Sequence, residues 1–258
     1  MLKPEEIFFA LESLNIKPGD VIMIHGDAIV AAQLEGSKSK KIFRFIKEII
    51  NFIGNKGTLV FPSFTYSSTK SEVFNVQNSQ STVGLLSEGF RKYEGVVRSR
   101  NPIFSVCSFG KYKRDFENSS IYDCFGEDSC FGLLHAYSGK LINIACNFEV
   151  TYLHYVEQKK NISYRYFKTF NGQILDNGKK TFVDTKYFVG KERINYDMDL
   201  GKLRHTLTKE NKFFTAKFGR FLSFSVSCND FSNSSEKLLE ENEYSLIKEK
   251  KNNKNCDL

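Results

Sequence analysis

The sequence is short of several features that would mark other classes of protein. It has no tryptophan and only four histidines, and its longest apolar runs fall far short of a membrane-spanning helix, which needs ~18 residues. The six cysteines include no C-x-x-C pair, and a chain of 258 residues does not need disulfides to fold. Near the N-terminus, Glu5, Glu6 and Glu12 interrupt the apolar residues, unlike in a signal peptide. We therefore expect a cytoplasmic protein with reduced thiols and no membrane partner.

Positive charge is present in excess but unevenly distributed. The chain carries 37 Lys and Arg against 30 Asp and Glu, a balance typical of folded proteins. Residues 151–220 hold 15 basic and 7 acidic side chains, whereas residues 1–150 hold 17 and 16. Such a field favours an anionic ligand and disfavours a polycation, unless these lysines merely solvate a surface.

Helical and strand patterns alternate through the first 160 residues. Helical spacing predicts helices over residues 4–14, 39–54 and 81–93, the second of them capped by Ser39. Short apolar stretches predict strands at 21–26, 57–64, 103–110 and 139–148. This order predicts an α/β fold, a layered mixed β-sheet flanked by helices. Active sites of such folds lie in the loops after the strands, here "HGDAI" and "PSFTY".

The last third of the chain has a different pattern. Two Asn-Gly pairs, 171–172 and 177–178, lie between alternating residues and predict β-hairpins. Residues 232–250 predict a charged helix, and the tail 250–258 is expected to fray. The C-terminal portion is thus predicted to be rich in β-hairpins.

The stretch "TYLHYVEQ" holds one of the four histidines with chemistry-bearing neighbours at a spacing of three. Thr151, His154 and Glu157 would share one face of a helix. The spacing alone permits a catalytic base with its orienting carboxylate, half of a metal site, or a structural pair. The H-x-x-E-H zinc motif needs a second histidine where this chain has Gln158, which disfavours the metal.

Five stretches in order resemble the aminoglycoside 3-N-acetyltransferase family. They are "GDVIMIHGDAI", "GNKGTLVFPSFTY", "GLLSEGFRKYEGVVRSRNPIFSVCSFG", "TYLHYVE" and the weaker "FGRFLSFSVSCNDF". The resemblance spans nearly the whole chain and implies one acetyltransferase domain, residues 1–258. Residues 1–163 would form the α/β core with the CoA site, and 164–258 would complete the acceptor site. The chain departs from the family at Asp27, commonly a hydroxyl residue, and at Asn101, commonly His.

The resemblance implies transfer of an acetyl group from acetyl-CoA to an amine, without a metal. The amine must lose a proton, for which His154 is the predicted base and Glu157 its orienting carboxylate. Thr151 and the loop at Gly26 are candidates for stabilising the oxyanion. The predicted cofactor-binding residues are His25, Gly26, Asp27, Ala28, Ser63, Thr65, Arg98 and Ser105. The predicted substrate-binding residues are Asp27, Tyr66, Tyr164 and Arg165. A structural role for His25 and a capping role for Asp27 remain open.

The basic segment after the motif bears on the identity of the amine. It favours a nucleotide-linked (dTDP or UDP) amino sugar of surface glycan synthesis, with an aminoglycoside as the alternative. Cys146, eight residues before His154, is an alternative acyl-accepting nucleophile, although its apolar surroundings favour a buried inert thiol. A basic nucleic-acid-binding protein is a remote alternative, because no RNP, KH, zinc-finger or helix-turn-helix pattern is present. We expect no nucleic-acid partner, and a homodimer stays open.

Overall fold

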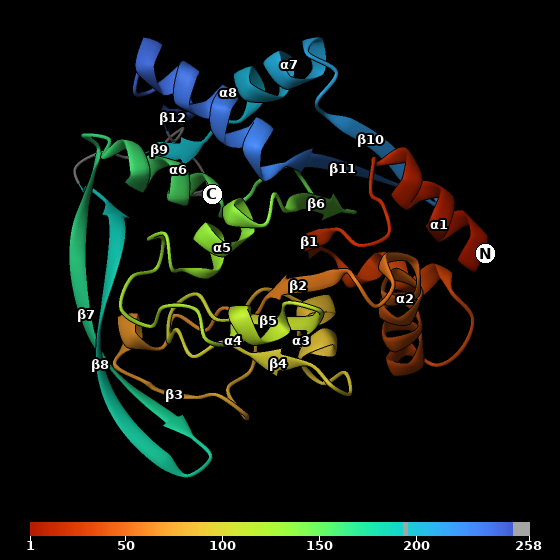
Figure 1. The fold of residues 1–258 in the computed structure, drawn as a ribbon, viewed down its shortest axis with the longest axis horizontal. Coiled ribbons are helices and arrows are strands. Elements are labelled where there is room, and N and C mark those ends of the chain that lie inside the picture. Colours follow the sequence, from red (N-terminus) through yellow and green to blue (C-terminus); the bar gives the residue numbers. More distant parts are fainter. Residues whose placement is uncertain (193–195, 250–258) are drawn as a thin grey trace, which may run out of the picture.

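A computed structural model describes residues 1–192 and 196–249. Its centre is a seven-stranded mixed sheet (Figure 1). The strands lie in the order β10 (Phe214–Phe218), β11 (Phe221–Ser227), β6 (Lys140–Ile144), β1 (Val21–Gly26), β2 (Thr58–Pro62), β5 (Val106–Gly110) and β4 (Val97–Arg98). The three central strands, β6, β1 and β2, run parallel, and the flanking strands pair antiparallel. The predicted mixed sheet is confirmed.

Helices cover both faces of the sheet and bury two apolar clusters. Side chains of α1 (Pro4–Ser13), α2 (Lys38–Ile53) and α3 (Leu85–Arg91) pack with Ile22 and Ile24 of β1. On the other face, Met23 packs with side chains of α4 (Lys113–Glu117), α5 (Cys130–Ala136), α6 (Leu153–Lys160), α7 (Gly201–Lys209) and α8 (Cys228–Glu241). Successive residues of a strand point to opposite faces, which explains why residues 21–24 of β1 are all apolar.

The predicted hairpin is a long curved ribbon at one side of the molecule (Figure 1). β7 (Arg165–Asp176) pairs with β8 (Lys179–Gly190), and β3 (Val73–Asn75) pairs in parallel with β7. Asn177 and Gly178 form the turn, both with positive φ. The other pair, Asn171-Gly172, is not a turn but lies inside β7. A Cβ on Gly172 would lie 2.0 Å from the Ser68 Oγ, so close packing explains this glycine.

Several predicted boundaries were wrong for local reasons. α2 begins at Lys38 after the N-cap Ser37, so Ser39 is not its cap. α3 begins four residues later than predicted, because Gly84 is the N-cap. α8 starts at Cys228, since the Ser227 side chain caps it, and ends at Glu241. The predicted tail 250–258 lies outside the described residues.

Short elements complete the chain. They are the 3₁₀ helices η1 (Ala28–Gln33) and η2 (Ser68–Lys70), and the pair β9 (Tyr196–Met198) with β12 (Ile247–Glu249). Within 1–192 and 196–249, no helix is long and apolar enough to cross a membrane. Across the same residues, no group of three or more His, Cys, Asp or Glu is placed to hold a metal ion.

Candidate active site

The pair His154 and Glu157 is joined directly on α6, which follows the central strand β6. His154 Nδ1 lies 2.6 Å from Glu157 Oε2, while the Glu157 side chain is fully buried and that of His154 is 17% exposed. Thr151 lies in the turn before the helix, where its carbonyl accepts the His154 N–H. In the described part of the chain, the Nε2 atom of His154 makes no hydrogen bond. One ring nitrogen is therefore held, and the other has no hydrogen-bond partner within the described residues.

Two further side chains fix the Glu157 carboxylate. Tyr164 donates its hydroxyl to Oε1 at 2.8 Å, and the Arg165 guanidinium lies 2.7 Å from Oε2. Burial raises the pKa of Glu157, but His154 and Arg165 outweigh this effect, so the carboxyl stays ionised. Tyr164 and Arg165 were predicted to bind substrate; that role stays a prediction, and the contact they make is with Glu157.

The His154 imidazole is suited to accept a proton near neutral pH. Burial lowers the pKa of His154, and the neighbouring Glu157 opposes this shift. The ring is therefore mostly neutral at pH 7, and Glu157 would stabilise the imidazolium once it forms. This geometry can perform general base catalysis.

An aromatic cluster connects the predicted residue Tyr66 to this histidine. Tyr66 follows β2 with a positive φ of 56°, and its ring packs 5.4 Å from Phe104. Phe104 packs on Phe125, whose ring lies 5.4 Å from His154. Tyr187 of β8 also contacts Phe104 and Phe125. The hairpin and the loop after β2 thus meet beside His154. The sequence did not predict that Phe125 and Tyr187 belong to this cluster.

The loop after β1 borders a cavity of about 320 Å³. Asp27 caps η1 by accepting the Ile29 N–H at 2.8 Å, which confirms the capping role. Lys41 also lines the cavity. A Cβ on Gly26 would lie 3.1 Å from a Leu86 methyl and 3.2 Å from the Ile144 carbonyl, so this loop needs a small residue. Asp27 and Ala28 lie at this cavity, where a cofactor role stays a prediction.

His25 lies near the end of β1, and its imidazole ring has no hydrogen-bond partner in the described part of the protein. Both ring nitrogens are buried and without a hydrogen bond among the residues that the structure describes. Burial lowers the pKa of His25 to about 4, so the ring is neutral at pH 7. Asn143, which pairs with His25 from the neighbouring strand β6, also has a buried Oδ1 without a hydrogen bond. Unpartnered buried polar atoms are costly in a purely structural role.

The remaining predicted cofactor residues form a buried internal network instead of an open site. Arg98 donates to the Ser63 carbonyl at 2.7 Å and to Ser105 Oγ at 3.3 Å. Ser105 also donates to the Ser63 carbonyl, and Thr65 donates to the carbonyl of Pro102. These contacts position the loops after β2 and before β5, and direct contact with a cofactor stays a prediction.

The two departures from the family pattern have local explanations. Asn101 Oδ1 accepts the N–H groups of Ile103 and Phe104, at 3.0 and 2.9 Å. The asparagine therefore caps a buried turn, and it makes no contact with His154. Asp27 supplies a cap that a hydroxyl residue also supplies, but it adds a negative charge.

Cys146 is poorly placed to act as a nucleophile. Its sulfur lies 3.7 Å from the Asn143 amide and 3.7 Å from the His25 carbonyl. Burial raises the pKa of the Cys146 thiol, and the charges of Asp27 and Glu149 add to this effect. The thiolate that a nucleophile requires is disfavoured here.

A comparison with known families identifies the family of this chain. The family model described as aminoglycoside 3-N-acetyltransferase matches residues 23–240. The chain belongs to this family. The predicted acyltransferase class is therefore confirmed.

Individual relatives are distant. The chain is 21% identical to aminoglycoside N(3)-acetyltransferase IX of Micromonospora chalcea over 193 residues, 67% of each chain. The solved structure of AAC-IIIb with CoASH has a TM-score of 0.77 at 18% identity, covering 93% of this chain and 96% of that chain. A variant of AAC(3)-IVa in complex with apramycin has a TM-score of 0.75 at 18% identity, covering 94% of both chains. These structures show the shared fold.

Proposed function

We propose that this protein is an acetyl-CoA-dependent N-acetyltransferase that acetylates an amine of a polyamine sugar of the aminoglycoside class. The observation that carries the proposal is the His154–Glu157 pair, in which Glu157 holds one ring nitrogen and the partly exposed His154 keeps the other without a hydrogen bond in the described structure. Family membership supports acetyl-CoA as the donor. A nucleotide-linked amino sugar, which the sequence favoured, finds no support among the relatives.

In this mechanism His154 accepts the proton as the amine attacks. The amine nitrogen forms a bond to the thioester carbonyl carbon, and its proton passes to His154 Nε2. The tetrahedral intermediate collapses, the carbon–sulfur bond breaks, and the proton neutralises the departing CoA thiolate. Glu157, fixed by Tyr164 and Arg165, stabilises the imidazolium through Nδ1. No acyl-enzyme is needed, which agrees with the raised pKa of Cys146.

His25 is suited to stabilise the oxyanion that develops on the thioester carbonyl. It is neutral at pH 7 and lies at the carboxyl end of β1, beside the strand that leads to α6. A neutral imidazole N–H can donate to the developing oxyanion without carrying a proton into the reaction. The cavity beside Asp27 and Lys41, about 320 Å³, would hold part of CoA. Thr151 remains a second candidate donor.

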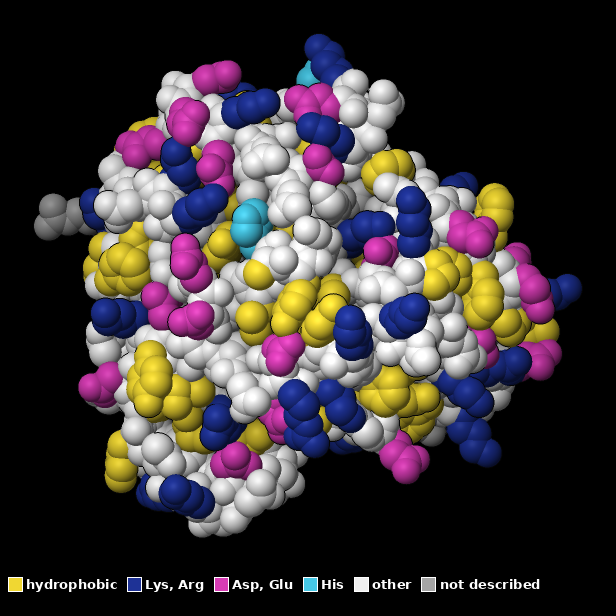
Figure 2. Space-filling model, in the orientation of Figure 1, with side chains coloured by type: hydrophobic (Ala, Val, Ile, Leu, Met, Phe, Trp, Pro, Cys, Tyr) yellow, Lys and Arg dark blue, Asp and Glu magenta, His cyan; other side chains and the backbone are white. Residues whose placement is uncertain are grey.

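The charge distribution in space weakens the argument that the sequence made against a polycationic acceptor. Two lysines of 151–220 form ion pairs with carboxylates from outside the segment, Lys159 with Glu236 and Lys160 with Glu240, and Arg165 pairs with Glu157 inside it. On the face shown in Figure 2, Lys and Arg are interspersed with Asp and Glu.

Carboxylates also lie beside the central strand ends. Asp27 and Glu149 are both exposed and near enough to act on Cys146. The loop that carries Phe125 against His154 contains Asp123, Glu127 and Asp128 without a basic residue. Carboxylates at these positions attract an amine-rich sugar.

The test is CoA release, followed with a thiol reagent, for a panel of acceptors. Kanamycin- and gentamicin-type amines are expected to turn over, whereas dTDP- and UDP-linked amino sugars are not. Turnover confined to the nucleotide sugars would overturn the acceptor class. Absence of any CoA-dependent acetylation across the panel, with CoA still bound, would count against the enzymatic proposal.

A further inference from the structure

A second cavity, of about 500 Å³, lies away from His154 at the edge of the sheet. Its walls come from β4, α4, the loop after β3 and the tip of the β7–β8 hairpin. In the order of strands, β4 is separated from β6 by β1, β2 and β5. Four arginines line the cavity: Arg91, Arg98, Arg100 and Arg114.

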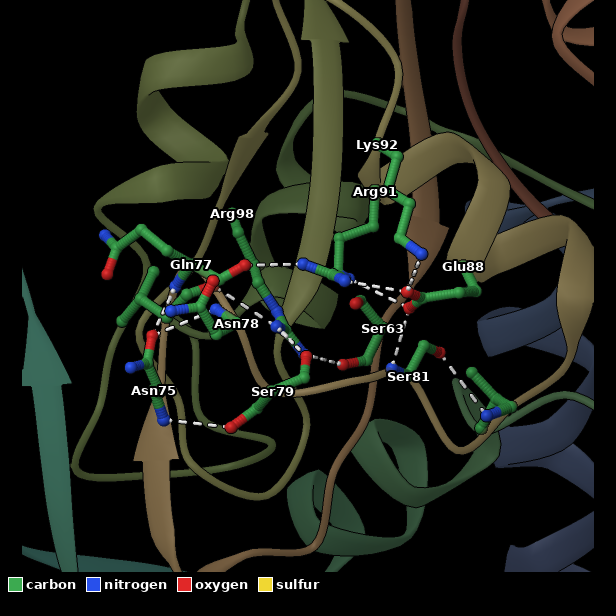
Figure 3. Close-up of polar contacts among 12 residues, drawn as sticks. Ser63, Asn75, Gln77, Asn78, Ser79, Ser81, Glu88, Arg91, Lys92 and Arg98 are labelled. Atoms are coloured by element: carbon green, nitrogen blue, oxygen red, sulfur yellow. Dashed lines mark hydrogen bonds and ion pairs between the residues drawn. The ribbon is translucent and has the colours of Figure 1, made fainter.

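Two of these arginines, Arg91 and Arg98, are largely buried, and among the residues that the structure describes only Arg91 has a carboxylate partner. Glu88 binds Arg91 through two hydrogen bonds, at 2.7 and 2.8 Å. Arg98 has no carboxylate partner in the described structure; it donates to the carbonyls of Val76 and Ser63, at 3.2 and 2.7 Å. Figure 3 shows both guanidinium groups directed at the main-chain loop that carries Gln77. The buried guanidinium group of Arg98 is therefore left without a negatively charged partner in the described structure.

The electrostatics of Arg98 agree with this deficit. Burial, joined by repulsion from Arg91, lowers the pKa of Arg98 to about 10. The guanidinium nevertheless remains charged at pH 7. A buried, uncompensated cation is unfavourable alone and becomes favourable when an anion binds.

The rim of the cavity carries two arginines and two carboxylates, so the excess of positive charge comes from the buried arginines. Arg114 is exposed and pairs with Glu117, and Asp176 accepts the Gln77 amide at 2.6 Å. Arg100 is exposed, and within residues 1–192 and 196–249 it forms no hydrogen bond or ion pair. The lining thus contains four guanidinium groups and two carboxylates.

We propose that this cavity binds a phosphate-bearing small molecule, gripped by Arg100 and Arg114 over the buried charge of Arg98. A guanidinium group can bind phosphate through two parallel hydrogen bonds. The volume of the cavity is that of a small-molecule site. A polyamine such as the acetyl acceptor is excluded by the sign of the field. The phosphate can belong to CoA itself or to a separate ligand, and the two sources are distinguishable.

The experiment uses inorganic pyrophosphate as the probe, at ionic strength matched with sodium chloride. Pyrophosphate at a hundred times its Kd is expected to raise the Tm of the full chain by roughly 5 °C. The double variant R100Q/R114Q should lose about half of this shift or more, and its Kd by calorimetry should weaken at least tenfold. R44Q, which removes an exposed arginine on α2, should behave as the unaltered protein.

The outcomes decide both the site and the source. An equal Tm shift in R100Q/R114Q and R44Q, or no binding of pyrophosphate, would overturn the proposal. If R100Q/R114Q also raises the KM for acetyl-CoA, the phosphate belongs to CoA. If that KM is unchanged while pyrophosphate binding is lost, the cavity serves a separate phosphorylated ligand.

Discussion

His154 Nδ1 lies 2.6 Å from the Glu157 carboxylate, one helical turn away, while Glu157 is in turn bound by Tyr164 and Arg165. The carboxylate therefore fixes which ring nitrogen is available for chemistry. A chain of fixed groups of this kind gives a base a defined direction and tautomer.

Removing the base should abolish turnover without disturbing the fold. H154N is expected to lower kcat by about 10²–10⁴-fold, with the Kd for CoA nearly unchanged. Steady-state kinetics and calorimetry measure the two quantities. H205N, at an exposed position of α7, is the matched control and should keep full activity. Retained turnover in H154N would refute the assignment.

Variants of the Glu157–Arg165 pair should distinguish the contribution of Glu157 to stability from its contribution to catalysis. E157Q leaves the buried Arg165 unpaired and is expected to cost about 3–5 kcal/mol of unfolding free energy. In R165M/E157Q no uncompensated charge remains, so much of that stability should return while activity stays low. Chemical denaturation and kcat measure this. Equal activity of the double variant and the unaltered protein would show that Glu157 has no part in catalysis.

The same carboxylate should set the pH dependence of the reaction. Glu157 raises the pKa of His154 against the effect of burial. Activity needs the neutral imidazole, so kcat/KM falls as the pH drops through the pKa of His154. In E157Q that pKa falls further, and the acidic limb of the profile should move to lower pH. A limb that stays in place would assign it to another group.

His25 should make the folded state sensitive to mild acid. Its pKa is about 4 in the folded protein, below the ordinary 6.5. The unfolded chain therefore takes up a proton that the folded chain refuses, and stability is lost as the pH falls from about 6.5 to 4. The loss is up to about 3 kcal/mol. Denaturation of H25L at several pH values should show a weaker dependence, and an unchanged one would contradict this.

Asp27 should matter for the acceptor through its charge. D27N keeps an oxygen that can cap η1 but removes the carboxylate. The KM for an aminoglycoside is expected to rise roughly three- to tenfold, whereas the KM for acetyl-CoA should not rise. E94Q, an exposed charge loss after α3, is the control. The same rise in E94Q would show a general field effect.

Glu88 offers an independent test of the arginine network. Burial raises its pKa, but hydrogen bonds from Arg91, the Ser81 N–H and Lys92 outweigh this and lower it to about 2. Its contribution to stability is present above the ordinary carboxyl pKa and lost as the pH falls toward 2. Thermal unfolding of E88Q should therefore depend less on pH between 5 and 2 than that of the unaltered protein.

The sequence by itself determined the layered mixed sheet, the central strands and the pairing of His154 with Glu157. Apolar runs and helical spacing are local properties, and a separation of three places two side chains on one helical turn. It also determined the family, because five ordered motifs cover nearly the whole chain.

Only the tertiary structure decided what these residues face. The +8 charge of 151–220 belongs to a stretch of sequence, but folding brings carboxylates from outside that stretch to two of its lysines, Glu236 to Lys159 and Glu240 to Lys160. Asn171-Gly172 has the pattern of a turn but pairs within a strand, where the glycine leaves space for Ser68 from a distant segment. Contacts between residues far apart in the chain leave no periodicity to read, so the buried charge of Arg98 and the aromatic wall beside His154 emerge only in three dimensions.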